Sequence, residues 1–149
     1  MYFGQTDVTS NMMLERQCAD QNIDIVILAF VISRNYSGSL YPSVNFGAAC
    51  SSQTSLMERE APGLLYCPEL ASDINTCQNT YGKKVLLSIG GSGGSIIFNI
   101  ASDASVFRSI LWGLFGPPGN VDINLRPFGD TSIDGFDIGK DLATSPRFY

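Results

Sequence analysis

Two aspartates near the carboxyl end of the chain have the type and spacing of residues that could carry out acid–base chemistry. Asp137 and Asp141 follow a short segment that begins at Asp134. Alternate residues of a strand point to the same face, so Asp137, Gly139 and Asp141 share a face if the strand continues that far. Acidic groups at the carboxyl end of a parallel strand lie where α/β proteins place their sites. The pattern predicts a carboxylate site, although acidic residues in a surface turn fit it as well.

A glycine-rich segment, residues 88–94, is the second candidate. It reads Ser-Ile-Gly-Gly-Ser-Gly-Gly and ends an apolar run. Glycines at the end of a strand allow a sharp turn or the close approach of a ligand. The segment lacks the Gly-Lys-Ser/Thr of phosphate-binding loops and does not match the dinucleotide-binding spacing. A tight turn alone explains it, but we favour a loop that faces a ligand.

The composition excludes several kinds of chemistry. The 149 residues amount to one domain and include no histidine, which excludes Ser-His-Asp and Cys-His mechanisms and histidine-ligated zinc or haem. A net charge of -5 argues against nucleic acid or an anionic membrane as partner. No apolar run approaches the ~20 residues that cross a bilayer. The first residues lack the basic and apolar regions of a secretory signal, so we expect that a signal was removed earlier or never existed.

Four cysteines, Cys18, Cys50, Cys67 and Cys77, set a further constraint. They allow three pairings, and the sequence does not choose among them. Reduced cysteines in a cytosolic protein are one alternative. Zinc is disfavoured because no Cys-x2-Cys pair exists. Residues 33–68 are long, polar and rich in serine, and such a segment needs a covalent tie to stay ordered, so we favour two disulfides in a secreted protein.

The elements that must position these groups alternate along the chain. Apolar runs predict strands, and apolar residues at helical spacing predict helices. The expected strands are residues 2–4, 23–30, 84–90 and 132–138, and the expected helices are residues 10–21, 68–78 and 102–115. Ser10 is expected to cap the first helix and Ser102 or Asp103 the last, where Trp112 is expected to serve packing.

This βαβαβαβ order calls for right-handed crossovers and a parallel sheet. An open flavodoxin-like sheet fits it, and so does the first half of a (β/α)8 barrel. Length favours the open sheet, since a barrel typically takes about 250 residues.

Several motifs together resemble the class III type chitinases of glycoside hydrolase family 18. They are the opening Tyr-Phe-Gly-Gln at residues 2–5, residues 45–50, Cys77-Gln78 before residues 82–91, Leu111-Trp112, residues 126–129 and the Asp-Gly-Phe-Asp of residues 134–137. The resemblance covers nearly the whole chain and follows the family's order and spacing. It implies an α/β fold that is the first half of a (β/α)8 TIM barrel, truncated after strand four. Residues 1–149 would be a partial family 18 catalytic domain.

The resemblance also implies a chemistry and a location. Family members hydrolyse β-1,4-N-acetylglucosamine linkages in chitin, with the substrate's own acetamido oxygen as nucleophile. Asp137, Asp141 and Asp134 would then lie on the catalytic side. Tyr2, Gln5, Asn45, Gly91 and Ser92 would line the sugar groove, although the first three could equally be ordinary strand or turn residues.

The family further implies an extracellular protein, the pairs Cys18–Cys77 and Cys50–Cys67, and neither cofactor nor metal. Chitin or N-acetylglucosamine oligosaccharides would be the partners. If the chain is half a barrel, its open edges would also favour self-association.

The fourth-strand motif departs from the family pattern Asp-Gly-x-Asp-x-Asp-x-Glu. Gly139 stands where the family has the Asp that positions the acetamido group, and Asp141 stands where it has the general acid Glu. An aspartate is one methylene shorter than a glutamate, and a misplacement of about 1 Å can cost about 100-fold in rate. We therefore expect this chain alone to be inactive.

Three hypotheses on function remain. The chain is a fragment of an ordinary secreted chitinase, a non-catalytic chitinase-like protein that binds chitin oligosaccharides or another protein, or an unrelated small open-sheet domain. A substitution and a small deletion near Ile138 would leave the same degenerate motif.

Overall fold

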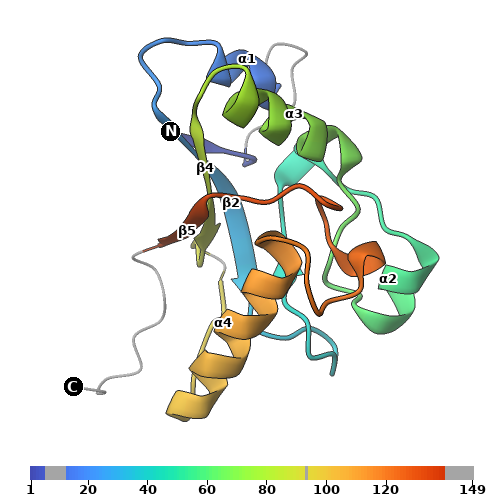
Figure 1. Cartoon of the computed structure of the whole chain (residues 1–149). Helices are drawn as coiled ribbons and strands as arrows, with labels where there is room; N and C mark the ends of the chain where they lie inside the picture. The colour runs from blue at the N-terminus through green and yellow to red at the C-terminus, as the bar shows by residue number, and fades with distance from the viewer. Residues whose placement is uncertain (6–12, 93, 140–149) are drawn as a thin grey trace.

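A computed structural model describes residues 1–5, 13–92 and 94–139, which form one sheet with helices packed against it (Figure 1). The strands are β1 (Tyr2–Phe3), β2 (Ile25–Ser33), β3 (Ser43–Val44), β4 (Lys84–Ile89) and β5 (Gly135–Ile138). The helices are α1 (Leu14–Cys18), α2 (Ser55–Glu60), α3 (Pro68–Asn79) and α4 (Ala101–Phe115), with two 3-10 turns, η1 (Gly47–Ala49) and η2 (Ile123–Leu125).

Four strands of the sheet are parallel to one another and lie side by side in chain order, β1-β2-β4-β5. The short β3 adds to β2 in the antiparallel direction. A doubly wound sheet reverses its strand order at a switch point, and this sheet does not. Sequential order with right-handed crossovers brings all connecting helices to the same face of the sheet. This arrangement is that of a partial (β/α)8 barrel and corrects the expectation from length alone.

The strand register divides the side chains between two faces. Tyr2 pairs with Ile27, Ile27 with Leu86, and Leu86 with Gly135. Paired residues of parallel strands point the same way. We call the face that carries these residues the inner face. Its members are Tyr2, Ile25, Ile27, Ala29, Lys84, Leu86, Ser88, Gly135 and Asp137.

The opposite, outer face packs against the helices. Its central side chains, Val26, Leu28, Val85 and Leu87, are fully buried. They join one hydrophobic core with the inward-facing residues of the helices, which include Leu14, Leu70, Ile74, Phe107 and Leu111. The helical spacing that predicted α3 and α4 therefore reflects one-sided burial.

The helix boundaries differ from expectation at their amino ends. Of the helix expected over residues 10–21, the structure shows Leu14–Cys18, and Ser10 lies outside the described residues. Helix α4 begins after Ile100, whose side chain makes no capping hydrogen bond, so Ser102 and Asp103 are not the N-cap. Asp103 instead accepts a hydrogen bond from the backbone N–H of Asn99 at 3.3 Å. A carboxylate in the first turn stabilises a helix without occupying the N-cap position.

A buried arginine ties the end of α4 to the segment before β5. Arg126 is almost fully buried, and its guanidinium donates to the carbonyls of Gly113, Gly116, Gly129 and Thr131. Burial lowers the pKa of Arg126, and the negative charge of Asp130 opposes this shift. The last carbonyl groups of a helix have no hydrogen-bond donors within the helix. The Arg126 guanidinium supplies such donors at the end of α4.

The two disulfides are Cys18–Cys77 and Cys50–Cys67, as the family resemblance implied. The first joins α1 to α3 and is fully buried, whereas the second ties the segment around η1 to the start of α3. Residues 33–68 therefore have the covalent tie that their composition called for. They also contain β3, η1 and α2, which the sequence pattern did not predict.

Candidate functional site

Three side chains from three parallel strands meet on the inner face. The Asp137 carboxylate accepts a hydrogen bond of 2.9 Å from the Tyr2 hydroxyl and one of 2.8 Å from the Ser88 hydroxyl. Both hydrogen bonds reach the same carboxylate oxygen, Oδ2. The cluster lies toward the carboxyl ends of β4 and β5, where parallel α/β folds place their sites. Two hydroxyl donors hold the carboxylate in one orientation while it stays open to a ligand.

The contact with Asp137 also changes the acidity of Tyr2. The hydrogen bond to Asp137 is the main cause that raises the pKa of the Tyr2 hydroxyl, with desolvation and the negative charge of Asp137 adding to it. The hydroxyl therefore stays protonated and serves as a donor throughout the physiological range. The Asp137 side chain therefore has two hydroxyl donors beside it.

The Phe30 ring lies between Tyr2 of this cluster and the glycine-rich turn. The Phe30 and Tyr2 rings lie 6.4 Å apart between centroids. Gly91 has φ +91°, and a Cβ there would come within 3.0 Å of the Phe30 ring. Only glycine fits this turn without displacing the ring. Gly91 is buried and Ser92 is exposed, and the contact of this loop with a ligand stays a prediction.

Gln5 lies after β1 and Asn45 directly follows β3, and within the described residues the hydrogen bonds of both side chains are with the backbone. The Gln5 side-chain amide donates to the carbonyls of Gly4, Ala29 and Asn45. The Asn45 side-chain oxygen accepts from the backbone N–H of Gly47 at 2.8 Å. These contacts hold the η1 segment against the end of β1. The structure shows that the two residues shape the backbone around the cluster, and their contact with sugar stays a prediction.

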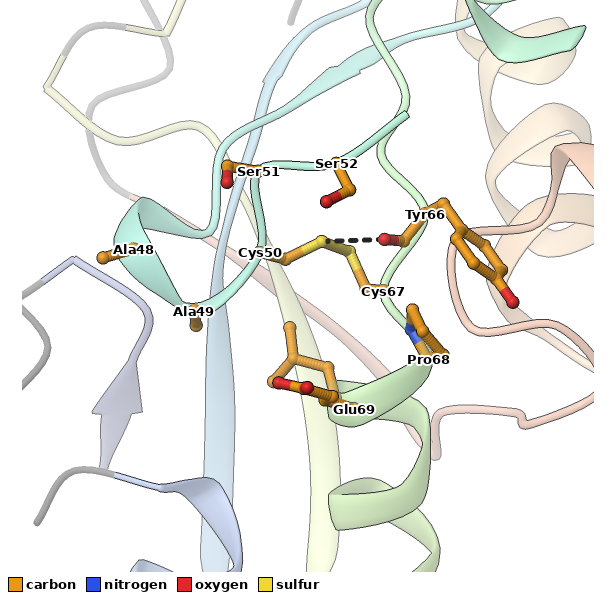
Figure 2. A pocket seen from close by; sticks show the side chains of 10 residues that line it. Ala48, Ala49, Cys50, Ser51, Ser52, Tyr66, Cys67, Pro68 and Glu69 are labelled. Atoms are coloured by element: carbon orange, nitrogen blue, oxygen red, sulfur yellow. Dashed lines mark hydrogen bonds between the residues drawn. A yellow bond between two sulfur atoms is a disulfide. The ribbon is translucent and has the colours of Figure 1, made fainter. Parts of the chain in front are cut away.

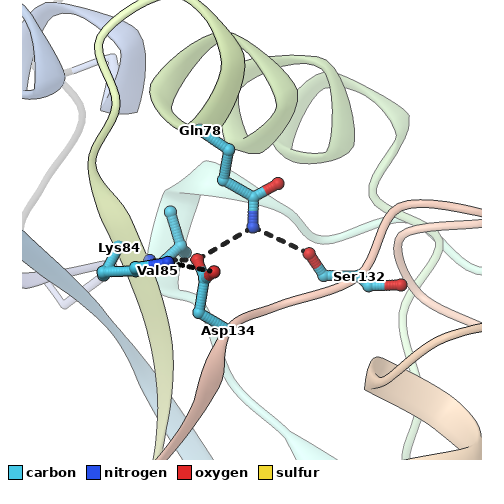
Figure 3. A network of polar contacts seen from close by, with 5 residues as sticks. All are labelled: Gln78, Lys84, Val85, Ser132 and Asp134. Atoms are coloured by element: carbon cyan, nitrogen blue, oxygen red, sulfur yellow. Dashed lines mark hydrogen bonds and ion pairs between the residues drawn. The ribbon is translucent and has the colours of Figure 1, made fainter.

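Asp134 lies apart from the cluster, just before the first residue of β5 (Figure 3). Its carboxylate accepts hydrogen bonds from the Gln78 side chain, the Val85 backbone N–H and the Lys84 ammonium. Burial opposes ionisation of Asp134, but these bonds outweigh it and lower the pKa of the carboxyl. The motif therefore contains two aspartates with different surroundings. Asp134 joins α3, β4 and β5, and Asp137 faces the open side.

The two positions that depart from the family pattern fall at the limit of the described residues. The Gly139 N–H donates to the Ile89 carbonyl at 2.9 Å. A Cβ at Gly139 would lie 3.9 Å from the Ser88 hydroxyl and 3.2 Å from the Ile89 carbonyl oxygen. A side chain at this position would therefore point toward the cluster, with little space at its base. Asp141 lies outside the described residues.

A separate pocket of about 330 Å³ lies where η1 approaches the start of α3 (Figure 2). The Cys50–Cys67 disulfide lines it, together with Ser51, Ser52 and Glu69. The Cys50 sulfur lies 3.3 Å from the Tyr66 carbonyl oxygen. Because a disulfide sulfur has no proton, this is a contact and not a donated hydrogen bond. Cys50 is half-buried and Cys67 is buried, so solvent in this pocket reaches the disulfide from the Cys50 side.

Sequence reasoning did not single out Phe30, and it named Ser88 only as the first residue of the glycine-rich segment 88–94. Ser88 is fully buried in a strand that otherwise reads Val-Leu-Leu and Ile around it, and a lone polar residue in such a run is a signal that was available. Phe30 had no such signal, since an aromatic residue in an apolar strand is ordinary. Its place beside Gly91 depends on how β2 and β4 pair.

Comparison with known proteins shows that this chain is similar in sequence and fold to chitinases. The chain is 39% identical to Chitinase 3 of Candida albicans over 141 residues, which are 93% of the chain and 23% of the relative. It is 37% identical to the endochitinase of Saccharomyces cerevisiae over 93% of the chain and 22% of the relative. A chitinase from Ipomoea carnea has the same fold with a TM-score of 0.70 and 28% identity, over 92% of this chain and 44% of that one. A comparison with protein-family models found no match.

This chain is similar to fungal class III chitinases and to solved chitinase-like structures of glycoside hydrolase family 18. It spans about a quarter of the length of the first two curated relatives and under half of the Ipomoea structure. A xylanase and α-amylase inhibitor protein from Scadoxus multiflorus is also similar, with a TM-score of 0.65 and 29% identity over 92% of this chain and 42% of that one. Family 18 chitinase relatives and a protein named for inhibition thus share this part of the fold.

Proposed function

We propose that residues 1–149 form part of a family 18 catalytic domain and bind N-acetylglucosamine oligosaccharides of the kind found in chitin. The observation that carries the proposal is the Asp137 carboxylate, held by Tyr2 and Ser88 at the carboxyl ends of parallel strands. A carboxylate and two hydroxyls suit the hydroxyl and amide groups of a sugar. The similarity to chitinases is the reason for choosing N-acetylglucosamine as the sugar. Two disulfides support an extracellular location.

The same site lacks what hydrolysis in this family requires. Substrate-assisted cleavage needs a general acid and a group that orients the acetamido oxygen. Gly139 has no side chain to orient it, and Asp141 is shorter than the expected glutamate. Loss of a single well-placed catalytic group costs about 10² to 10³ in rate. We propose that the chain alone binds sugar without measurable hydrolysis.

Calorimetric titration of the chain with an N-acetylglucosamine tetrasaccharide tests the binding. We expect saturable binding that Asp137→Asn weakens at least tenfold. Asp122→Asn serves as the matched control, because Asp122 caps η2 and an asparagine keeps that function. Absence of binding, or equal weakening by both variants, would contradict the sugar site.

The second candidate is a protein-binding role, which the similarity to the inhibitor protein from Scadoxus multiflorus favours. A hydrolysis assay with a fluorogenic chito-oligosaccharide separates both binding roles from an active enzyme. We expect no turnover above background. Turnover by the unaltered chain would show that another carboxylate serves as the acid.

We also propose that the chain associates with itself. Within the described residues, no helix has the length and apolar character that a membrane span requires. The exposed apolar side chains on the inner face of the sheet, such as Ile25, support self-association.

A further inference from the structure

Asn35 begins an acceptor motif for N-linked glycosylation, which the proposed function does not use. The motif is Asn-x-Ser or Asn-x-Thr, with any residue except proline in the middle, and residues 35–37 read Asn-Tyr-Ser. No other asparagine of the sequence has a serine or threonine two residues later. A motif this short also occurs by chance, so the surroundings of Asn35 in the fold decide whether it can carry a glycan.

The motif lies in the loop between β2 and β3, where backbone contacts form a tight turn. The Tyr36 carbonyl accepts a hydrogen bond from the Ser39 N–H at 2.9 Å, and the Tyr36 N–H donates to the Tyr41 carbonyl at 3.1 Å. Ser37 has φ +50°, in the left-handed region that is found mostly in turns. A turn at the surface of a protein is the setting in which glycosylated asparagines are expected.

All three residues of the motif, Asn35, Tyr36 and Ser37, are exposed. Within the part of the chain that the structure describes, no hydrogen bond involves the Asn35 side chain, so a substituent on its amide nitrogen costs no contact of the fold. The loop also does not follow an edge strand, because β2 pairs with β1 on one side and with β4 on the other. The exposure of Asn35 therefore belongs to a loop whose neighbouring strands are both in place.

We propose that Asn35 carries an N-linked glycan in the secreted protein. The Nδ2 atom of Asn35 forms a bond to the anomeric carbon of an N-acetylglucosamine, which begins an oligosaccharide carried by a lipid pyrophosphate. The bond from that carbon to the pyrophosphate oxygen breaks, the lipid pyrophosphate leaves with the electron pair, and the amide nitrogen passes one proton to a base of the transferase. The step belongs to the oxidising compartment in which disulfides form. It rests on the proposed extracellular location but not on sugar binding by Asp137.

A hollow beside Asn35 gives the first sugar a surface to lie on. The hollow has a volume of about 210 Å³, and its lining includes Asn35, Leu40 and residues of α4. Leu40 is 75% exposed, and covering an apolar side chain removes apolar surface from water. An ion pair of 2.8 Å between Arg34 and Asp103 joins the loop to α4, and so holds the two walls of the hollow together. We expect the C–H groups of the first N-acetylglucosamine to pack on Leu40.

Peptide mass spectrometry of the secreted chain tests the attachment. The chain is produced in yeast behind a cleavable secretory leader, and alkylation verifies that its cysteines are oxidised. Peptide N-glycosidase in heavy-oxygen water converts each glycosylated asparagine into a labelled aspartate. We expect the label at residue 35. An unlabelled Asn35 in the secreted, oxidised chain overturns the proposal.

Two variants remove the motif in different ways. Asn35→Gln removes the acceptor, whereas Ser37→Gly keeps the acceptor and removes the hydroxyl, and glycine suits φ +50° at this residue. Both variants should lose the fall in mass that peptide N-glycosidase causes in the unaltered chain. Asn120→Gln is the matched control, because Asn120 is also exposed but is followed by Val121 and Asp122, and it should keep that fall. A fall in mass that persists in either motif variant overturns the assignment.

Thermal denaturation tests where the first sugar lies. An endoglycosidase that cleaves after the first N-acetylglucosamine leaves one sugar on Asn35, and we expect this trimmed chain to melt at a higher temperature than Asn35→Gln. Leu40→Ser removes the apolar side chain from the hollow and should abolish the difference. An equal difference with and without Leu40 overturns the position over the hollow. No measurement uses chitin oligosaccharides, so failed sugar binding by the Asp137 cluster leaves these results intact, and the converse also holds.

Discussion

The hydrogen bond from the Tyr2 hydroxyl to Asp137 makes the pKa of Tyr2 depend on the side chain at position 137. The Tyr2 pKa is raised mainly by this bond, so its stabilising effect is complete below the ordinary tyrosine pKa of about 10 and is lost as the pH rises through the higher folded value. Asp137→Asn should return the Tyr2 pKa toward about 10. Carbon NMR of labelled tyrosine rings over a pH series measures this. An unchanged Tyr2 titration would contradict the contact.

The departures at Gly139 and Asp141 invite a restoring experiment, which we expect to fail in this chain. Gly139→Asp together with Asp141→Glu should give no hydrolysis of a fluorogenic chito-oligosaccharide above background. The Cβ of residue 139 would be tight against the Ile89 carbonyl oxygen, at 3.2 Å. The same two changes in a full-length relative with the degenerate motif should restore activity. Turnover by the double variant of the 149-residue chain would contradict this account.

At this scale the structure separates two aspartates that the sequence grouped in one motif, and their catalytic roles stay predictions. Asp137 was predicted from its place at the end of a strand, and it does lie in the open cluster. Asp134 shares the motif but is held among Gln78, Lys84 and Val85 at the start of the same strand. Motif spacing shows that residues belong together but does not show which end of the strand each occupies. Ser88 and Phe30 joined the site through strand pairing, which is a long-range property.

Among the elements, α4 depends on a residue outside it. Arg126→Met removes the donor to four carbonyls, including two near the end of α4. Unpaired buried polar groups are costly, so we expect a loss of about 3 kcal/mol in the free energy of unfolding. Urea denaturation measures it. Arg108→Met, on the exposed face of the same helix, should change stability by no more than about 0.5 kcal/mol. Similar losses in both variants would contradict the role of Arg126.

The elements that were predicted well are those with strong periodic patterns. β4 and α3 match expectation to within a residue at each end because apolar runs and a first-turn proline mark them. β3 and α2 were missed because segments of two and six residues carry too little pattern. They depend instead on pairing with β2 and on the Cys50–Cys67 disulfide.

At the scale of the whole molecule, the two disulfides differ in access and in the stability they contribute. Cys50–Cys67 lines an open pocket with Cys50 half-buried and Cys67 buried, whereas both cysteines of Cys18–Cys77 are fully buried. Loops of 17 and 59 residues correspond to about 3 and about 4 kcal/mol in the chain-entropy account. We expect a mild dithiol reductant to open Cys50–Cys67 first, with the fold retained. Alkylation followed by peptide mass spectrometry measures the order. Prior reduction of Cys18–Cys77 would contradict the burial argument.

The overall architecture was only half determined by the alternation of elements. The order βαβαβαβ fits an open sheet and a partial barrel equally. The choice depends on whether β4 pairs next to β2 and whether β5 then follows β4, and nothing within a single strand encodes its neighbour. The combined motifs of the family resolved what periodicity left open.

Trp112 is the only tryptophan of the chain, and its position gives the molecule a built-in optical probe. Its ring lies 6.4 Å from that of Phe136, edge to face, and so spans the gap between α4 and β5. At 48% exposure it is partly shielded from water. Its emission wavelength therefore follows the solvent around one βα unit, the last that the structure describes. Fraying of that unit would shift the emission to the red before circular dichroism detects any loss of helix.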